Sequence, residues 1–293
     1  MSFGLSKMAL PDTIRLTYYS LPENQFYRLR APLPQERIKE LLEARYPSLR
    51  GEKDLYYSSF TVGMAPCGYV SLWMVGGAGW LLVDTFRAEK TEVDFKTAFP
   101  FYNCTQQEAF ESFTNDLYPF IREEMRAGTL SSRYWEDLTK TYSWKLRITD
   151  PDFEVYNYSV YTINVERRII ESAGDWLTTR GEKAVPAELI LYLKHEKDPI
   201  RYKLHLTFEK AVMDYDSTKD EEELVLKHRY RMRELMNLFE SFYAQAGDEE
   251  VELVLDFNDE MTDVTVMLRT ATWELEIPGC EIAIYDSERY KLS

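Results

Sequence analysis

An uncharged stretch between Asp54 and Asp84 restricts the fold of this chain more than any other feature. Residues 55–83 contain no Lys, Arg, Asp or Glu, so they belong either in a protein core or in a membrane. A membrane-spanning helix needs about 20 predominantly apolar residues, but Pro66 and five glycines interrupt this stretch. We therefore expect buried β-strands and no transmembrane segment.

The residues around this stretch predict a ββαβββ order. Alternating apolar and polar residues at 13–19 and 25–31 are typical of a β-hairpin. A helix is expected from Pro34, which is tolerated in a first turn, until Pro47 ends the helical spacing. Three strands complete the unit, at 56–62, 69–75 and 80–86.

The last third of the chain repeats this order. Strand patterns at 186–192 and 201–208 precede a helix at 220–246, and strand patterns follow at 251–257, 264–268 and 273–277. This similarity suggests a pseudo-duplication. Residues between the two units predict helices, with a capping box at Thr105–Glu108 and an interruption at Pro119, followed by strands.

The expected fold class is α+β, with antiparallel sheets and a few helices. The expected segments are 1–90 (first ββαβββ unit), 91–185 (helical and strand connector) and 186–293 (second ββαβββ-like, acidic unit). Because no Pro/Gly/Ser-rich linker separates them, we expect one compact body.

Charge and cysteine content narrow the classes of function. The chain has 50 acidic and 35 basic residues, a net charge of -15, which repels nucleic-acid phosphates and argues against nucleic-acid binding. Its three cysteines form no C-x-x-C pair, which argues against a disulfide framework. Together with the lack of a signal-peptide pattern, this favours a cytoplasmic protein.

Candidate catalytic and metal-binding residues are few. Cys67 lies between Pro66 and Gly68 and could be a nucleophile, but such a cysteine needs a base. The histidines are distant in sequence, so we expect Cys67 to be a buried turn residue. The expected hairpin register places His195 opposite Arg201 and His205 opposite Leu191, too far apart to share a metal. We expect no metal site, no cofactor and no catalytic residue.

Acidity is concentrated near the C-terminus. Residues 186–293 contain 25 acidic and 13 basic residues, a net charge of -12, and residues 248–263 contain no Lys or Arg. In a strand at 251–257, Glu250, Glu252, Val254 and Asp256 would share the face opposite Val251, so that the acids point outward and are free to meet a partner. We expect a docking surface for a basic partner at Asp256, Asp259, Glu260 and Asp263. The alternative is a solubilising face.

Several motifs resemble a known family. They are Tyr19-Ser20, Asn24-Gln-Phe-Tyr27, Leu33-Pro34 and, above all, Gly63-Met-Ala-Pro-Cys-Gly-Tyr-Val-Ser-Leu-Trp73 with Gly76. They are similar to an uncharacterised bacterial domain-of-unknown-function family with a Gly-x-Ala-Pro-x-Gly-x-Val-x-x-Trp core. Some members are lipoproteins, and others occur beside toxin genes of type VI and other contact-dependent secretion systems. The resemblance covers about residues 15–90 and implies no catalytic residues. Gly63, Pro66, Gly68 and Trp73 are interpreted as turn and core positions.

The resemblance and the charge pattern together favour a non-catalytic protein-binding protein. On this interpretation the chain is a bacterial immunity protein that neutralises a secreted toxin, and its partner is a basic toxin domain. Two alternatives stay open at this point. One is an enzyme with a site near Cys67 or between the halves, and the other is a ligand-binding, envelope-associated module.

Overall fold

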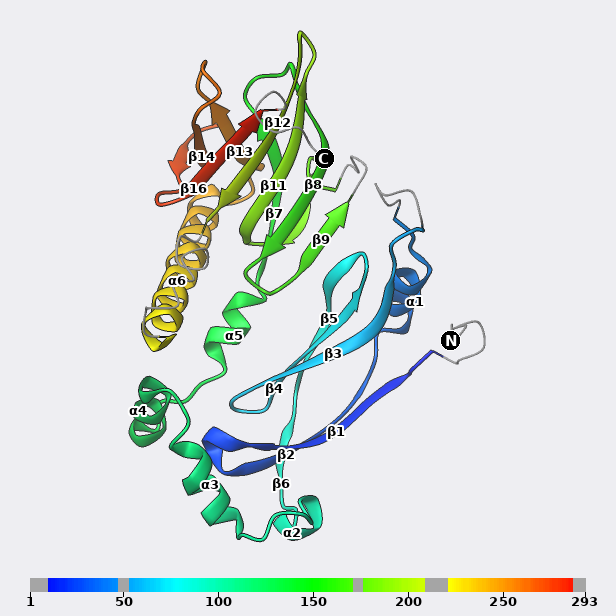
Figure 1. Ribbon diagram of the computed structural model, residues 1–293, viewed down its shortest axis with the longest axis vertical. Coiled ribbons are helices and arrows are strands. Elements are labelled where there is room, and N and C mark those ends of the chain that lie inside the picture. The colour runs from blue at the N-terminus through cyan, green and yellow to red at the C-terminus, as the bar shows by residue number, and fades with distance from the viewer. Residues whose placement is uncertain (1–9, 47–52, 171–175, 209–220, 287–293) are drawn as a thin grey trace. The chain divides into compact units, whose positions relative to one another are not determined.

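The computed structural model describes residues 10–46, 53–170, 176–208 and 221–286 (Figure 1). Within these ranges six α-helices accompany sheets whose strands pair mostly antiparallel, so the predicted α+β class is confirmed. None of the helices in these ranges combines the length and the apolar composition needed to cross a membrane.

The strands are β1 (Thr13–Ser20), β2 (Gln25–Pro32), β3 (Tyr57–Ala65), β4 (Tyr69–Gly76), β5 (Gly79–Arg87), β6 (Glu89–Thr91), β7 (Thr141–Ile148), β8 (Phe153–Thr162), β9 (Arg167–Ile170), β10 (Gly181–Ala184), β11 (Pro186–His195), β12 (Asp198–Thr207), β13 (Val251–Phe257), β14 (Val264–Arg269), β15 (Glu274–Glu276) and β16 (Glu281–Asp286). The helices are α1 (Gln35–Glu43), α2 (Phe95–Ala98), α3 (Gln106–Thr114), α4 (Pro119–Ala127), α5 (Arg133–Leu138) and α6 (Glu221–Ala246), and a 3-10 turn covers Leu21–Glu23.

The chain divides into two compact units. The first contains Met1–Ala44, Tyr56–Gly76 and Leu81–Glu136, and the second contains Arg45–Leu55, Gly77–Trp80 and Asp137–Ser293. This division differs from the three segments expected from the sequence. The middle segment expected at 91–185 is divided at Glu136, because α2, α3 and α4 pack in the first unit whereas β7 and β8 belong to the second.

In the first unit, a hairpin packs on a three-stranded meander. β1 pairs antiparallel with β2, and the short strand β6 pairs with the other edge of β2. The meander has the order β5-β4-β3. Tyr27 and Leu29 are alternate residues of β2, so their side chains share a face, and they form a buried cluster with Val70 of β4.

Helix boundaries in the first unit follow local signals. The Thr105 hydroxyl and the Glu108 carboxylate form the predicted capping box at the start of α3. Pro119 is the first residue of α4, so the predicted interruption by this proline is confirmed.

The second unit contains two groups of paired strands. One is a sheet with the order β10-β7-β13-β14-β15, in which β13 pairs parallel with β7 from Val251↔Trp144 to Leu255↔Ile148. In the other, antiparallel pairing joins β16, β12, β11, β8 and β9 in that order, and β9 pairs with Gly79 and Trp80. Alternate residues of both groups fill the core, as with Leu191 and Leu253, which are fully buried.

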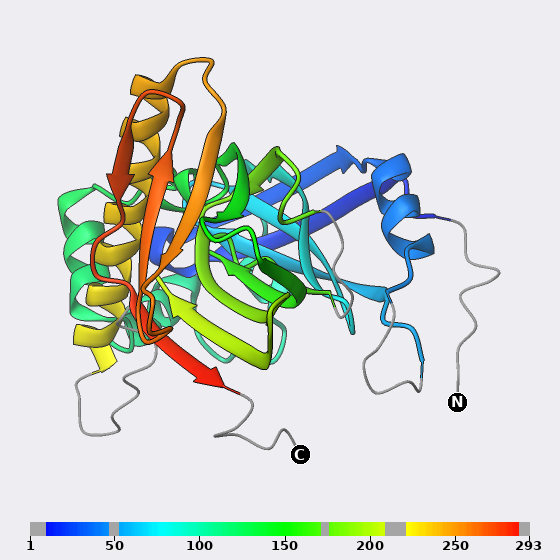
Figure 2. The ribbon, with the colours of Figure 1, turned by 90° about the horizontal axis from the view of Figure 1, so that it is seen from above.

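Helix α6 packs beside the sheet that contains β13 and β14 (Figure 2). The rings of Phe239 and Tyr243 contact Tyr142 of β7, with centroid separations of 5.6 Å and 4.8 Å. Phe242 stacks on Trp273 at 4.1 Å. The apolar stripe of this helix is therefore buried against aromatic residues.

The two regions compared by sequence share an element order and a pairing pattern. Hairpin β1–β2, helix α1 and strands β3, β4 and β5 correspond to hairpin β11–β12, helix α6 and strands β13, β14 and β15. The next strand pairs with the second strand of the hairpin in both regions, β6 with β2 and β16 with β12. A common origin by duplication stays a prediction.

Candidate functional site

Three turns lie at one end of the second unit (Figure 1). They connect β7 to β8, β11 to β12 and β13 to β14. The Thr149 N–H donates to the Leu255 carbonyl at 3.0 Å, and the Glu196 N–H donates to the Asp152 carbonyl at 3.0 Å. A backbone hydrogen bond thus fixes the β7–β8 turn to each of the two neighbouring hairpins.

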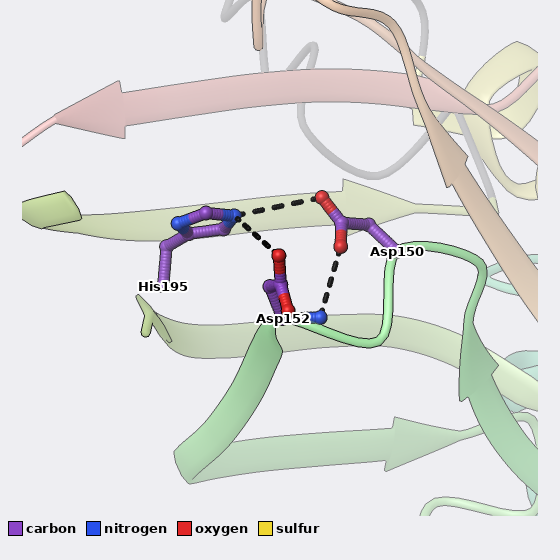
Figure 3. A group of neighbouring side chains, drawn as sticks. All are labelled: Asp150, Asp152 and His195. Atoms are coloured by element: carbon purple, nitrogen blue, oxygen red, sulfur yellow. Dashed lines mark hydrogen bonds and ion pairs between the residues drawn. The ribbon is translucent and has the colours of Figure 1, made fainter. Parts of the chain in front are cut away.

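A cluster of Asp150, Asp152 and His195 joins two of these turns (Figure 3). His195 Nε2 lies 3.6 Å from Asp150 Oδ2 and 4.0 Å from Asp152 Oδ2. The Asp152 N–H donates to Asp150 Oδ1 at 2.9 Å. The ring of Phe153 packs edge-on against the imidazole at a centroid separation of 4.8 Å.

Two carboxylates and an imidazole could serve as metal ligands, and their ligand atoms lie within 4.8 Å of one another. The hydrogen bonds favour a different role. The Lys197 N–H donates to His195 Nδ1 at 3.3 Å, so the proton of a neutral imidazole is on Nε2, the atom that a metal would need. The Lys197 ammonium contacts Asp152 and lowers the pKa of that carboxyl group. The cluster therefore fits a polar link between two turns better than a metal centre.

Sequence reasoning missed this cluster. Only His195 and His205 were considered together as metal ligands. In the structure His205 lies opposite Ile190, one residue from the expected register. A bulge after Lys194 pairs His195 with Asp198. His205 instead contacts Glu188 at 3.0 Å. The missing information was the neighbour of β11 on its other edge, where β8 places the turn at Asp150–Asp152 beside His195.

A pocket of about 390 Å³ lies beside the cluster, between β7 and β8. Leu146, Ile148, Val155 and Leu177 line it with apolar side chains, and Asp150 and Glu154 contribute carboxylates. This volume is at the lower end of the range for small-molecule sites and also suits a single large side chain. Glu154 is engaged by Lys194 at 2.8 Å, so its charge is partly compensated.

The predicted docking residues gather on the β13–β14 turn and the end of β13. Asp256, Asp259, Glu260 and Asp263 are all exposed, and none of them forms an ion pair with another residue in the described ranges. Asn258 holds the turn, since its Oδ1 accepts from the Thr262 N–H at 2.8 Å and from the Asp263 N–H at 3.1 Å. The Thr149 hydroxyl donates to Asp256. We call these four acids the acidic turn.

The start of the acidic segment differs from expectation. Glu250 and Glu252 contact Lys145 of β7 at 2.7 Å and 3.3 Å, and Glu252 also contacts Arg147 at 3.2 Å. The parallel neighbour β7 therefore neutralises these two carboxylates, and they are not free to meet a partner. Val254, expected on the same outward face, is fully buried.

Cys67 lies in the first unit and is exposed, which corrects the expectation that it is buried. It adopts a positive φ of 60° in the β3–β4 turn. The Glu23 carboxylate accepts from the Cys67 N–H at 3.0 Å, the Tyr27 hydroxyl at 2.6 Å and the Ser20 hydroxyl at 2.6 Å. The Cys67 thiol faces the Leu130 carbonyl at 3.6 Å. These contacts fix a tight turn around Cys67.

Part of the chain matches a known family. Residues 3–126 match the family described as Protein of unknown function (DUF2931). No curated protein and no solved structure matched the chain. The matched region contains the Gly63–Trp73 motif and the Cys67 turn, whereas the acidic turn and the Asp150–Asp152–His195 cluster lie outside it. The chain is thus similar, over residues 3–126, to an uncharacterised domain family.

Proposed function

We propose that this chain is a non-catalytic protein-binding protein whose acidic turn docks a basic protein partner. The observation that carries this proposal is the exposure of four carboxylates on a turn whose backbone is held by Asn258. A turn ordered before binding loses little conformational entropy when a partner docks.

Charge distribution supports this choice of surface. Glu250 and Glu252 are compensated by lysine and arginine on β7, whereas the acidic turn keeps its negative charge. In a chain of net charge -15, such an end attracts a basic protein over a Debye length and orients it during encounter. The β7–β8 turn, which carries Asp150, is held to β13 by the hydrogen bond from Thr149 to Leu255.

The finer form of the proposal is an immunity protein that neutralises a secreted toxin, with a basic toxin domain as partner. It rests on the family resemblance of the Gly63–Trp73 motif and on the charge of the acidic turn. Blocking a toxin requires occupation of its surface and no chemistry, which agrees with the turn-fixing role of the contacts around Cys67.

A small ligand in the pocket between β7 and β8 is the second candidate function. Its volume of about 390 Å³ and its combination of apolar walls with carboxylates favour a compact cationic ligand. Calorimetric titration with arginine methyl ester tests this candidate, and an Asp150→Asn variant should bind this probe about tenfold more weakly.

The docking proposal is tested with a purified basic protein encoded by the gene adjacent to this one. The variant Asp259→Lys/Glu260→Lys should slow association at low salt by about tenfold and flatten its salt dependence. The matched control, Glu43→Lys/Glu92→Lys, makes the same change in net charge at exposed positions of the first unit. Equal association rates for both variants across a salt series would reject the acidic turn as the docking surface.

A further inference from the structure

The edge strand β3 in the first unit has features of a strand-pairing site. It is nine residues long and pairs with β4 along one edge only. No backbone hydrogen bond joins residues 58–65 to any described segment other than β4. An edge strand of this length presents a row of amide and carbonyl groups that can pair with another strand.

β3 lacks the charges that protect edge strands in native proteins. The other five edge strands of the described sheets, β1, β6, β10, β15 and β16, each contain at least one Arg, Lys, Asp or Glu. β3 has the sequence YSSFTVGMA, with no charge and no proline. This strand is the exception among the edges that the structure describes.

The apolar side chains of β3 form an exposed row. Phe60, Val62 and Met64 are alternate residues and therefore share one face, and they are 39%, 37% and 54% exposed. Their neighbours across the β3–β4 ladder are Met74, Leu72 and Val70, which are almost completely buried. The apolar layer that is covered over β4 thus continues onto β3 without a cover from the described residues.

We propose that β3 pairs antiparallel with β3 of a second copy of this chain, centred on Val62. In this register Val62 lies opposite the partner's Val62, and Phe60 lies opposite the partner's Met64. Because directly opposite residues of an antiparallel pair point to the same face, the two rows join into one apolar strip. The interface is isologous, as two-fold symmetry requires.

The charge of the chain favours a second copy that meets at this strand. Two copies of net charge -15 repel each other, so their closest contact is most favourable where neither carries a charge. The apolar row also matches itself when reversed, because a large side chain stands on each side of Val62. The inference is independent of the docking proposal, since β3 and the acidic turn belong to different units.

The experiment measures the mass of the full-length chain by light scattering and sedimentation over a concentration series. We expect the fraction of dimer to rise with concentration and the dimer to predominate at about 100 μM, as for an interface of micromolar affinity. Val62→Lys and Val62→Glu should each be monomeric, because each places like charges opposite each other. A mixture of these two variants should form a mixed dimer, because the lysine introduced in one chain would then lie opposite the glutamate introduced in the other.

Two controls separate strand pairing from general effects. Phe101→Lys replaces an apolar side chain that is 95% exposed outside β3 and should leave the dimer unchanged. Circular dichroism of each variant checks that the fold is retained. Hydrogen exchange should show protection of residues 58–65 that increases with protein concentration. A monomeric wild-type chain, or a dimer that survives both Val62 variants, would overturn the inference.

Discussion

Lys183 in the second unit shows how strongly the protein interior opposes a buried charge. The residue is only 3% exposed. Its Nζ donates to the carbonyls of Trp144 and Thr179 at 2.6 Å and 2.7 Å. The indole rings of Trp144 and Trp176 lie 5.2 Å and 5.3 Å from Nζ. Burial, with a smaller effect from Arg168, lowers the pKa of Lys183 from 10.5 to about 8.

The direction of the pH effect follows from this shift. Below pH 8 the ammonium is charged in both the folded and the unfolded chain, so the folded state bears the full cost of burying it. Between about pH 8 and 10.5 the folded protein has lost the proton that the unfolded chain still binds, so stability rises with pH. The shift from 10.5 to about 8 corresponds to about 3 kcal/mol at 1.36 kcal/mol per unit.

Lys183→Met removes this titration. It also leaves the buried Trp144 carbonyl without this donor, at a cost of about 1–3 kcal/mol, and removes the donor to the partly buried Thr179 carbonyl, so the loss offsets the gain from removing the charge. We therefore expect a difference from wild type of no more than about 3 kcal/mol at neutral pH. Relative to Lys183→Met, the wild type should gain about 3 kcal/mol between pH 8 and 10.5.

Urea unfolding of the full chain, followed by tryptophan fluorescence across this pH range, measures the difference. Lys39→Met, at an exposed position of α1, is the matched control and should show no such trend. A wild-type advantage that stays constant or falls as the pH rises would refute the reasoning. It would mean that the carbonyl and indole contacts outweigh burial.

Three further outcomes are expected in the first unit and at the cysteines. Glu23→Gln cannot accept all three of its hydrogen bonds, so the free energy of unfolding should fall by about 1–3 kcal/mol, whereas the exposed control Glu36→Gln should change little. Gly68→Ala should lower the melting temperature of the protein more than Gly128→Ala. Both glycines have a positive φ, but a Cβ at Gly68 would lie 2.3 Å from the Ala88 carbonyl oxygen, whereas a Cβ at Gly128 meets nothing within 4 Å. Iodoacetamide at pH 8 should modify the exposed Cys67 long before Cys280, because burial raises the pKa of the Cys280 thiol to about 11. Equal modification rates of the two cysteines in mass spectrometry would contradict this.

Local patterns in the sequence determined the element types and much of their order. The helix starts at Thr105 and Pro119 depend on neighbouring residues alone, and the structure has both. Alternation also predicted which side chains of 251–257 point away from Val251. Exposure of Asp259 and Glu260 follows from their place in a polar turn, so this part of the candidate site was accessible from sequence.

Tertiary structure decided the features that depend on which distant strands become neighbours. The parallel pairing of β13 with β7 brings Lys145 to Glu250 and Glu252 and compensates their charge, whereas the acidic turn keeps its negative charge. The pairing of β11 with β8 assembles Asp150, Asp152 and His195. Neither neighbour is encoded in local periodicity, because a strand can satisfy its backbone hydrogen bonds with many partners. The choice among partners is made by burial of the whole core, to which residues far apart in the chain contribute together.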